Sequence, residues 1–383
     1  MQVTDVKTYL INPGINKNWL FVKVETDEGI YGWGEAYTQL DRDRTIEIHI
    51  EQLARYLKGR NPFDIRHFTF MAYNDFAGKR GSLELFCAIS ALEQALWDIA
   101  GKATNQPVYN LLGGATRKRQ RVYANGWGGG GSLQQLQDDA TAVIAKGFSA
   151  LKFDPFPNPW RAYIGKPEED SAVARVAAVR EAVGPDVEIL VEVHRRLAPA
   201  QAIRVATRIA EYRPYWYEEP VSARDLDALA EVKRSISLPV VTGEELYTKN
   251  EFRDVMTKRA VDLLNPDVCN CGGILELREI AAMAECHHIA VSPHNYNSTT
   301  IGLAATIHAT AGMINCPITE YFVNFEEIGR KIAHAPLVAK DGYVDLPTAP
   351  GLGVDLDEEK LAAYPYREFP NRNLRTPAEE WGG

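Results

Sequence analysis

Four glutamates and a histidine in the second half of the chain recur at a regular spacing. Glu192 and Glu218, Glu218 and Glu244, and His294 and Glu320 are each 26 residues apart. A strand of about five residues, a helix of ten or more and two short loops add up to about this length. The spacing therefore places each residue at the same position of successive strand–helix units, where a barrel of parallel strands builds its active site.

The first three of these glutamates form a candidate metal site. Any single one could be a helix cap or a solvated loop acid, but Glu192, Glu218 and Glu244 each follow an apolar strand in register. Three carboxylates brought close together repel strongly, and a divalent cation with oxygen ligands is the least costly remedy. The pattern predicts Mg²⁺, for which Mn²⁺ could substitute. No His or Cys completes a tetrahedral shell in register, which disfavours zinc.

Two histidines and an aspartate occupy positions suited to acid–base chemistry. His194 lies two residues beyond Glu192, and second neighbours share a strand face, so we expect both to point into the site. A lone histidine after a strand is more often structural. Asp267, however, ends the strand before that of His294, where its carboxylate would orient the imidazole and stabilise its protonated form. This pairing favours a His–Asp base.

A lysine supplies the positive charge that an anionic substrate would need. Lys152 closes the second predicted strand and faces the same end of the barrel. It could hold a substrate carboxylate, although a structural lysine at the barrel rim is an equally good interpretation. The net charge of −9 makes such a local cation necessary for binding an acid.

The elements that must position these residues are read from hydrophobic periodicity. After residue 121, short apolar strands alternate with amphipathic helices, which is typical of βα units around a parallel sheet. We predict a modified TIM barrel over residues 120–330, an N-terminal α+β capping domain over 1–115, and a C-terminal segment over 331–383 that completes the capping domain. The eight expected strands are 122–125, 150–153, 188–193, 215–217, 239–242, 262–264, 289–292 and 318–319.

Composition limits the class of protein. The 383 residues are 45% hydrophobic and 24% charged, as in a soluble globular protein of two domains. The acidic balance and the absence of basic runs disfavour binding to nucleic acid or anionic membranes. Five cysteines do not form a disulfide framework and fit a reducing compartment, so we expect the cytoplasm, with no signal segment and no membrane span.

Motifs spread over nearly the whole chain carry a resemblance to a known family. They are Thr26-Asp-Glu-Gly29, Gly32-Trp-Gly-Glu35, the helix over residues 95–102, Glu218-Glu-Pro220, Gly243-Glu244, Asn265-Pro-Asp267, Cys271-Gly-Gly273, Pro293-His294 and Pro350-Gly-Leu-Gly-Val354. With them the chain resembles the mandelate racemase subgroup of the enolase superfamily, and within it the sugar acid dehydratases.

The resemblance implies a role for each residue of the constellation. Glu192, Glu218 and Glu244 become Mg²⁺ ligands, and Asp267 and His294 become a base dyad that removes the α-proton of a carboxylic acid. The product of that step is an enediolate.

On the same grounds Glu320 becomes a hydrogen-bond donor to the enediolate, and His194 the general acid. The capping domain in such proteins covers the barrel, so residues 16–19, and more weakly 79–82, are expected to contact the substrate.

Two departures from the family pattern bear on the reaction. The third-strand ligand is usually Asp, and Glu192 is one methylene longer. The racemases carry Lys-x-Lys on the second strand, whereas Lys152-Phe-Asp154 has an acid in place of the second lysine. Without that base, and with His194 placed to protonate a leaving hydroxyl, elimination of water is favoured over racemisation.

The expected enzyme is therefore a carbon–oxygen lyase, a hydro-lyase that converts a sugar acid, an aldonate such as galactonate or a related acid, into a 2-keto-3-deoxy acid. An epimerase, racemase or cycloisomerase on the same scaffold is the alternative. A glycosidase is disfavoured because the adjacent Glu218 and Glu219 point to opposite faces of a strand. A catalytically silent binding protein is disfavoured by the intact acid–base residues. The expected partners are a small-molecule substrate and further copies of the chain, as a homo-oligomer.

Overall fold

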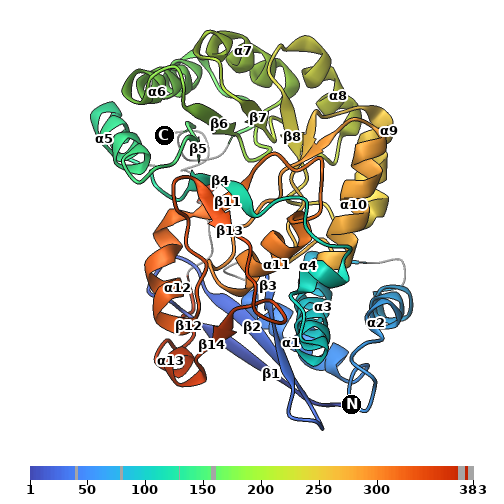
Figure 1. Cartoon of the computed structure of the whole chain (residues 1–383). Coiled ribbons are helices and arrows are strands. Elements are labelled where there is room, and N and C mark those ends of the chain that lie inside the picture. The colour runs from blue at the N-terminus through green and yellow to red at the C-terminus, as the bar shows by residue number, and fades with distance from the viewer. Residues whose placement is uncertain (39–41, 78–80, 129, 157–160, 370–375, 378–383) are drawn as a thin grey trace.

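The computed structural model describes residues 1–383 except 39–41, 78–80, 129, 157–160, 370–375 and 378–383. Figure 1 shows an N-terminal sheet with its helices below a curved parallel sheet that is surrounded by helices. The expected fold class, a βα barrel with an N-terminal capping domain, is confirmed. In the described part of the chain, no helix is long and apolar enough to cross a bilayer.

The N-terminal domain is an antiparallel three-stranded sheet covered by helices. Its glycines at 32 and 34 allow close packing, since a Cβ on either would lie within 2.0 Å of the backbone oxygens of Ala95 or Ala91 in α3. The strand β3 therefore approaches α3 more closely than other residues would permit. The elements are β1 (Val3–Ile11), β2 (Trp19–Thr26), β3 (Tyr31–Ala36), α1 (Asp43–Ala54), α2 (Ile65–Met71), the π-helix η1 (Ala72–Ala77), α3 (Leu83–Thr104) and α4 (Val108–Leu111).

Seven of the eight barrel strands begin within one residue of their expected starts, and the first begins three residues earlier than expected. They pair in parallel in the order β10-β9-β8-β7-β6-β5-β4-β11. The strands β10 and β11 stand at the two ends of this order. They are joined by contacts of the adjoining residues, such as the hydrogen bond that Ser292 Oγ donates to the Ile318 carbonyl at 2.8 Å. The strands are β4 (Arg119–Asn125), β5 (Ala150–Phe153), β6 (Glu188–Glu192), β7 (Trp216–Glu218), β8 (Val240–Thr242), β9 (Leu263–Leu264), β10 (Ala290–Val291) and β11 (Thr319–Phe322).

Helices follow the barrel strands; most bury one apolar face, whereas α11 (Ile301–Thr310) is buried along its whole length. Ser132 and Asp225 cap the first turns of α5 and α8 by accepting hydrogen bonds from backbone amides. The helices are α5 (Leu133–Ile144), α6 (Lys166–Val183), α7 (Pro199–Ile209), α8 (Leu226–Ser235), α9 (Thr248–Lys258), α10 (Ile274–Cys286), α11 (Ile301–Thr310) and α12 (Glu326–Ile332), with short 3₁₀ turns η2 (Ala210–Tyr212) and η3 (Val323–Phe325).

The C-terminal residues return to the N-terminal sheet. Asp355 accepts hydrogen bonds from the Tyr31 hydroxyl and the Trp33 indole, both at 2.5 Å. Glu358 contacts Lys23 and Tyr9 of the same sheet. The elements are β12 (Ala333–His334), β13 (Tyr343–Asp345), which pairs with β4, β14 (Asp355–Leu356) and α13 (Glu358–Ala362).

Candidate active site

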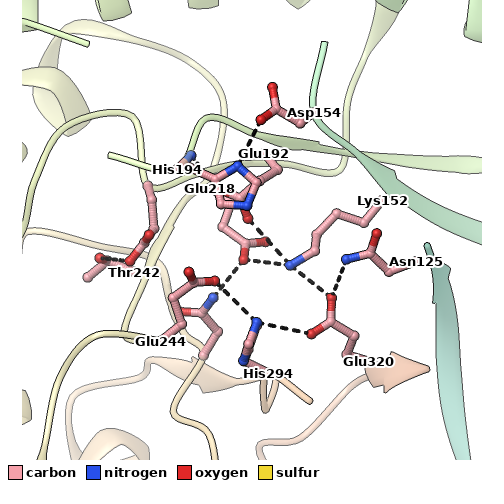
Figure 2. Close-up of polar contacts among 12 residues, drawn as sticks. Asn125, Lys152, Asp154, Glu192, His194, Glu218, Thr242, Glu244, His294 and Glu320 are labelled. Atoms are coloured by element: carbon pink, nitrogen blue, oxygen red, sulfur yellow. Dashed lines mark hydrogen bonds and ion pairs between the residues drawn. The ribbon is translucent and has the colours of Figure 1, made fainter. Parts of the chain in front are cut away.

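The three glutamates predicted to bind metal lie together at the carboxyl ends of neighbouring strands. Glu192 ends β6, Glu218 ends β7, and Glu244 lies two residues beyond β8. One carboxylate oxygen from each lies within 4.8 Å of the others, and all three side chains are buried. The 26-residue spacing thus corresponds to one βα unit. Figure 2 shows the three glutamate side chains close together.

The donor set fits a hard divalent cation. Among the described residues, Glu218 Oε2 is buried and has no hydrogen-bond partner, so its lone pairs lack the donor that a buried oxygen normally has. Burial raises the pKa of Glu218 well above its usual range, and the neighbouring Glu192 raises it further. A cation held by three carboxylate oxygens would satisfy this oxygen and relieve the repulsion.

The ammonium of Lys152 lies among these carboxylates. Its Nζ is 2.8 Å from Glu218, 2.9 Å from Glu320 and 3.4 Å from Glu192, and its side chain is 2% exposed. Burial alone would lower the pKa of Lys152, but Glu218 and Glu320 outweigh this effect and place the pKa well above its usual value. Lys152 is therefore a fixed positive charge beside the predicted metal ligands, and not a rim lysine.

His294 and Asp267 form the predicted pair. His294 Nδ1 lies 2.7 Å from Asp267 Oδ2, while Nε2 is 3.3 Å from Glu244 and 3.5 Å from Glu320. The Asn297 amide and the Cys269 backbone N–H donate to Asp267 and fix its carboxylate. The hydrogen bond to Asp267 therefore turns Nε2 toward the cluster (Figure 2).

The acidic surroundings make His294 unusually basic. Burial opposes its protonation, but Glu320 and Glu244 outweigh burial and raise the pKa of His294 to about 9. Positive charge bound at the glutamates would counteract this increase, because it cancels part of the negative charge that His294 faces.

Glu320 lies opposite Glu244 as an ionised hydrogen-bond acceptor. It accepts from Asn125 Nδ2 and from the Asn295 backbone N–H, both at 2.8 Å. Burial would raise its pKa, but Lys152 and His294 outweigh burial, so the pKa of Glu320 lies below its usual value. Donation to an enediolate requires a proton that this arrangement does not favour, and the donor role of Glu320 stays a prediction.

His194 reaches the site by a route that strand alternation did not predict. The strand β6 ends at Glu192, not at Val193, and His194 lies in a turn with a left-handed φ of 54°. Its backbone N–H donates to Glu192 Oε1 at 2.6 Å. Its ring lies on the side of the cluster opposite His294 (Figure 2).

Two arginines after His194 join the site, although no sequence pattern had indicated a role for them. Arg195 contacts Glu219, and its guanidinium lies 2.7 Å from Glu244 Oε1. It therefore forms an ion pair with one of the predicted metal ligands. Arg196 contacts Asp154, the acid in place of the second-strand lysine. Their position beside His194 was the only signal in the sequence, and their partners lie in other βα units.

The loop expected to contact substrate lies over the barrel. Lys17 is 2% exposed; its ammonium donates to the Tyr296 carbonyl and lies 3.7 Å and 4.4 Å from the ring centroids of Tyr296 and Tyr37. The Tyr37 ring in turn lies 6.0 Å from the ring of His294. Of the second expected segment, residues 79 and 80 lie outside the described part of the chain.

Comparisons with known proteins agree with this architecture. Residues 14–113 match the N-terminal domain of mandelate racemase and muconate lactonizing enzyme, and residues 135–360 match the enolase C-terminal domain-like family. The crystal structure of a mandelate racemase/muconate lactonizing enzyme from Sulfitobacter sp. superposes with a TM-score of 0.88 at 33% identity, covering 96% of each chain.

Relatives of the chain include proteins named as two kinds of sugar acid dehydratase. A D-galactonate dehydratase from Ralstonia pickettii (strain 12J) is 36% identical over 94% of this chain and 93% of its own length. A D-gluconate dehydratase from Thermoproteus tenax is 35% identical over 90% of this chain and 69% of its own length. The chain belongs to the mandelate racemase/muconate lactonizing enzyme family of the enolase superfamily.

Proposed function

We propose that this protein is a hydro-lyase that dehydrates a sugar acid, an aldonate such as galactonate or gluconate, to a 2-keto-3-deoxy acid. The observation that carries the proposal is a pair of histidines, each hydrogen-bonded to an aspartate, on opposite sides of one carboxylate cluster. The relatives named D-galactonate and D-gluconate dehydratase support the same reaction.

His294 is the proposed base. Because Nδ1 is held by Asp267, Nε2 faces the cluster and can take the proton from C2 of the substrate. The electron pair of the broken C–H bond moves into the carboxylate and gives an enediolate. Lys152, a fixed cation among the glutamates, offsets the added negative charge.

His194 is the proposed acid. It donates a proton to the hydroxyl on C3, which leaves as water as the electron pair of the enediolate forms a C2–C3 double bond. The resulting enol gains a proton at C3 and loses the hydroxyl proton from the oxygen on C2, which gives the 2-keto-3-deoxy acid. Only water is lost, so neither oxidant nor reductant is needed.

Glu192, Glu218 and Glu244 would hold the divalent cation, for which Mg²⁺ is proposed and Mn²⁺ is a substitute. Such a cation, when bound, supplies positive charge that lowers the energy of a substrate carboxylate as it gains electron density.

We also retain the predictions that the enzyme acts in the cytoplasm as a homo-oligomer.

The test is a screen of aldonic and aldaric acids for 2-keto acid formation, with NMR identification of the product. Chelator-treated, dialysed protein should be inactive and should recover when Mg²⁺ is added. Glu218→Gln, which keeps size but removes charge, should not recover. Full turnover in excess chelator, or a product that is only an epimer of the substrate, would refute the proposal.

A further inference from the structure

We infer that Asp154 is a positioning residue for His194: it binds Nδ1 of the imidazole so that Nε2 is the nitrogen presented to the leaving hydroxyl. This inference rests on the proposed function for its kinetic consequence. The hydrogen bond itself, between Asp154 Oδ2 and His194 Nδ1 at 2.8 Å, stands independently of the reaction.

Asp154 is itself held at both carboxylate oxygens. It directly follows β5, and its Oδ1 accepts a hydrogen bond from the Phe156 backbone N–H at 2.9 Å. Its Oδ2 is shared between His194 Nδ1 and the guanidinium of Arg196. An acceptor fixed in this way has a defined direction, which a solvated loop carboxylate would not have.

The backbone contacts around His194 leave its ring orientation open. The turn is secured by the His194 N–H to Glu192 Oε1 and by the Arg195 N–H to the Glu219 carbonyl, both at 2.6 Å. Consecutive left-handed residues, with φ of 54° and 52°, make this a turn that its neighbours must impose. These bonds fix the backbone but do not decide which ring nitrogen faces the cluster, because the imidazole can rotate about its Cβ–Cγ bond.

The contact with Asp154 makes that decision. Figure 2 places Asp154 on the side of the His194 ring away from Glu218 and Lys152, so that the other ring nitrogen is turned toward the cluster. A carboxylate at Nδ1 requires a proton on that nitrogen, and it orients the ring as Asp267 orients His294. The site thus contains two aspartate–histidine pairs, and Asp154 replaces the lysine of a racemase as part of a proton donor.

The test compares Asp154→Ala and the shape-conserving Asp154→Asn with the exposed control Asp186→Ala, which removes an acid just before β6. With an accepted sugar acid in D₂O, both Asp154 variants should exchange the α-proton within about threefold of wild type, while dehydration falls about 10²-fold. The control should change neither rate.

A second measurement does not depend on turnover. In ¹⁵N-histidine-labelled protein, the His194 signal, assigned by its loss in His194→Asn, should report Nδ1 as protonated in wild type. Replacement of Asp154 should shift this signal toward a mixture of tautomers.

An unchanged His194 signal, or equal losses of exchange and dehydration in the Asp154 variants, would overturn the inference. If no acid is dehydrated by wild type, the proposed function fails, and the NMR measurement alone decides the role of Asp154. If Asp154→Ala does not fold, Asp154→Asn gives the decision.

Discussion

Glu192 occupies a position at which the resemblance to the family leads us to expect an Asp. Its carboxylate has three tasks in the structure. One oxygen accepts the His194 backbone N–H, the other lies 3.4 Å from Lys152, and the side chain completes the cluster with Glu218 and Glu244. One side chain thus contacts both the turn and the cluster.

Shortening Glu192 should therefore weaken the enzyme without abolishing its activity. Glu192→Asp keeps a carboxylate but loses reach, so we expect reduced turnover and a higher Mg²⁺ requirement. Glu192→Ala should lower metal affinity about 10²-fold or more, because a ligand is lost. Calorimetric titration with Mn²⁺ measures this directly. Wild-type affinity in Glu192→Ala would show that the residue is not a ligand.

The two histidines should fail at different steps. His194→Asn retains His294, Asp267 and the glutamates, so it should still exchange the substrate's α-hydrogen with solvent deuterium while losing dehydration. His294→Asn should show neither, with a loss of about 10³-fold or more. The check is an NMR time course in D₂O beside a 2-keto acid assay. Exchange by His294→Asn but not by His194→Asn would reverse the two assignments.

The sequence could predict this site because its regularity is local to each unit. One βα unit per glutamate is enough to place Glu192, Glu218 and Glu244 at one end of the barrel. It could not predict the partners of His194, since Asp154 is 40 residues away and the two meet only after the strands pair. His194 lies on the expected side of the site although β6 ends before it, because contacts, and not residue type, impose the left-handed turn.

At the scale of elements, the loop between β1 and β2 connects the capping domain to the barrel loop that carries His294. Asn12 organises it by donating to the Lys17 carbonyl at 3.3 Å and to Asn18 Oδ1 at 3.0 Å. Lys17 then places its ammonium on the Tyr296 carbonyl and between two aromatic rings. The sequence predicted that residues 16–19 would approach the site, but not which side chain makes the contact, because Tyr296 lies 279 residues further along the chain.

Replacing Lys17 should loosen this cover. Lys17→Met keeps the length of the side chain but removes the cation, so the loop loses its electrostatic attachment. We expect KM to rise about tenfold, with a smaller change in kcat, since the acid–base residues remain in place. The exposed Lys7→Met on β1 is the control. A fall in kcat at unchanged KM would instead give Lys17 a part in the chemistry.

At the scale of the whole molecule, the capping domain is bound to the barrel through buried polar contacts. Glu35 near the end of β3 accepts hydrogen bonds from two backbone N–H groups: that of Ser298, in the loop that follows β10, at 2.7 Å, and that of Gly302, in the first turn of α11, at 2.8 Å. Gln94 of α3 donates to the Val268 carbonyl. The motif Gly32-Trp-Gly-Glu35 thus serves both the packing of β3 on α3 and the docking of the domain, which explains why the overall arrangement was predictable from short motifs.

His308 joins three parts of the molecule in one buried contact. It lies in α11 of the barrel, its Nδ1 accepts the Tyr109 backbone N–H of α4, and its Nε2 donates to the Leu352 carbonyl of the C-terminal segment, each at 3.1 Å. Because Nδ1 is an acceptor, the ring must be neutral with its proton on Nε2. Burial lowers the pKa of His308 to about 4, although the bond to Leu352 opposes this.

This histidine should make the protein less stable in mild acid. An unfolded histidine has a pKa of about 6.5, so between that pH and about 4 the unfolded chain binds a proton that the folded chain does not. The stabilising contribution of the neutral His308 is therefore complete above pH 6.5 and is lost as the pH falls toward 4. The free energy of unfolding lost in this way by pH 5 is about 2 kcal/mol. His308→Gln can donate and accept at the same positions without titrating. Urea unfolding at pH 7.5 and pH 5 should show a smaller acid-induced loss of unfolding free energy for His308→Gln than for wild type. The exposed His287→Gln should lose as much as wild type. Equal losses in wild type and His308→Gln would place the acid sensitivity elsewhere in the molecule.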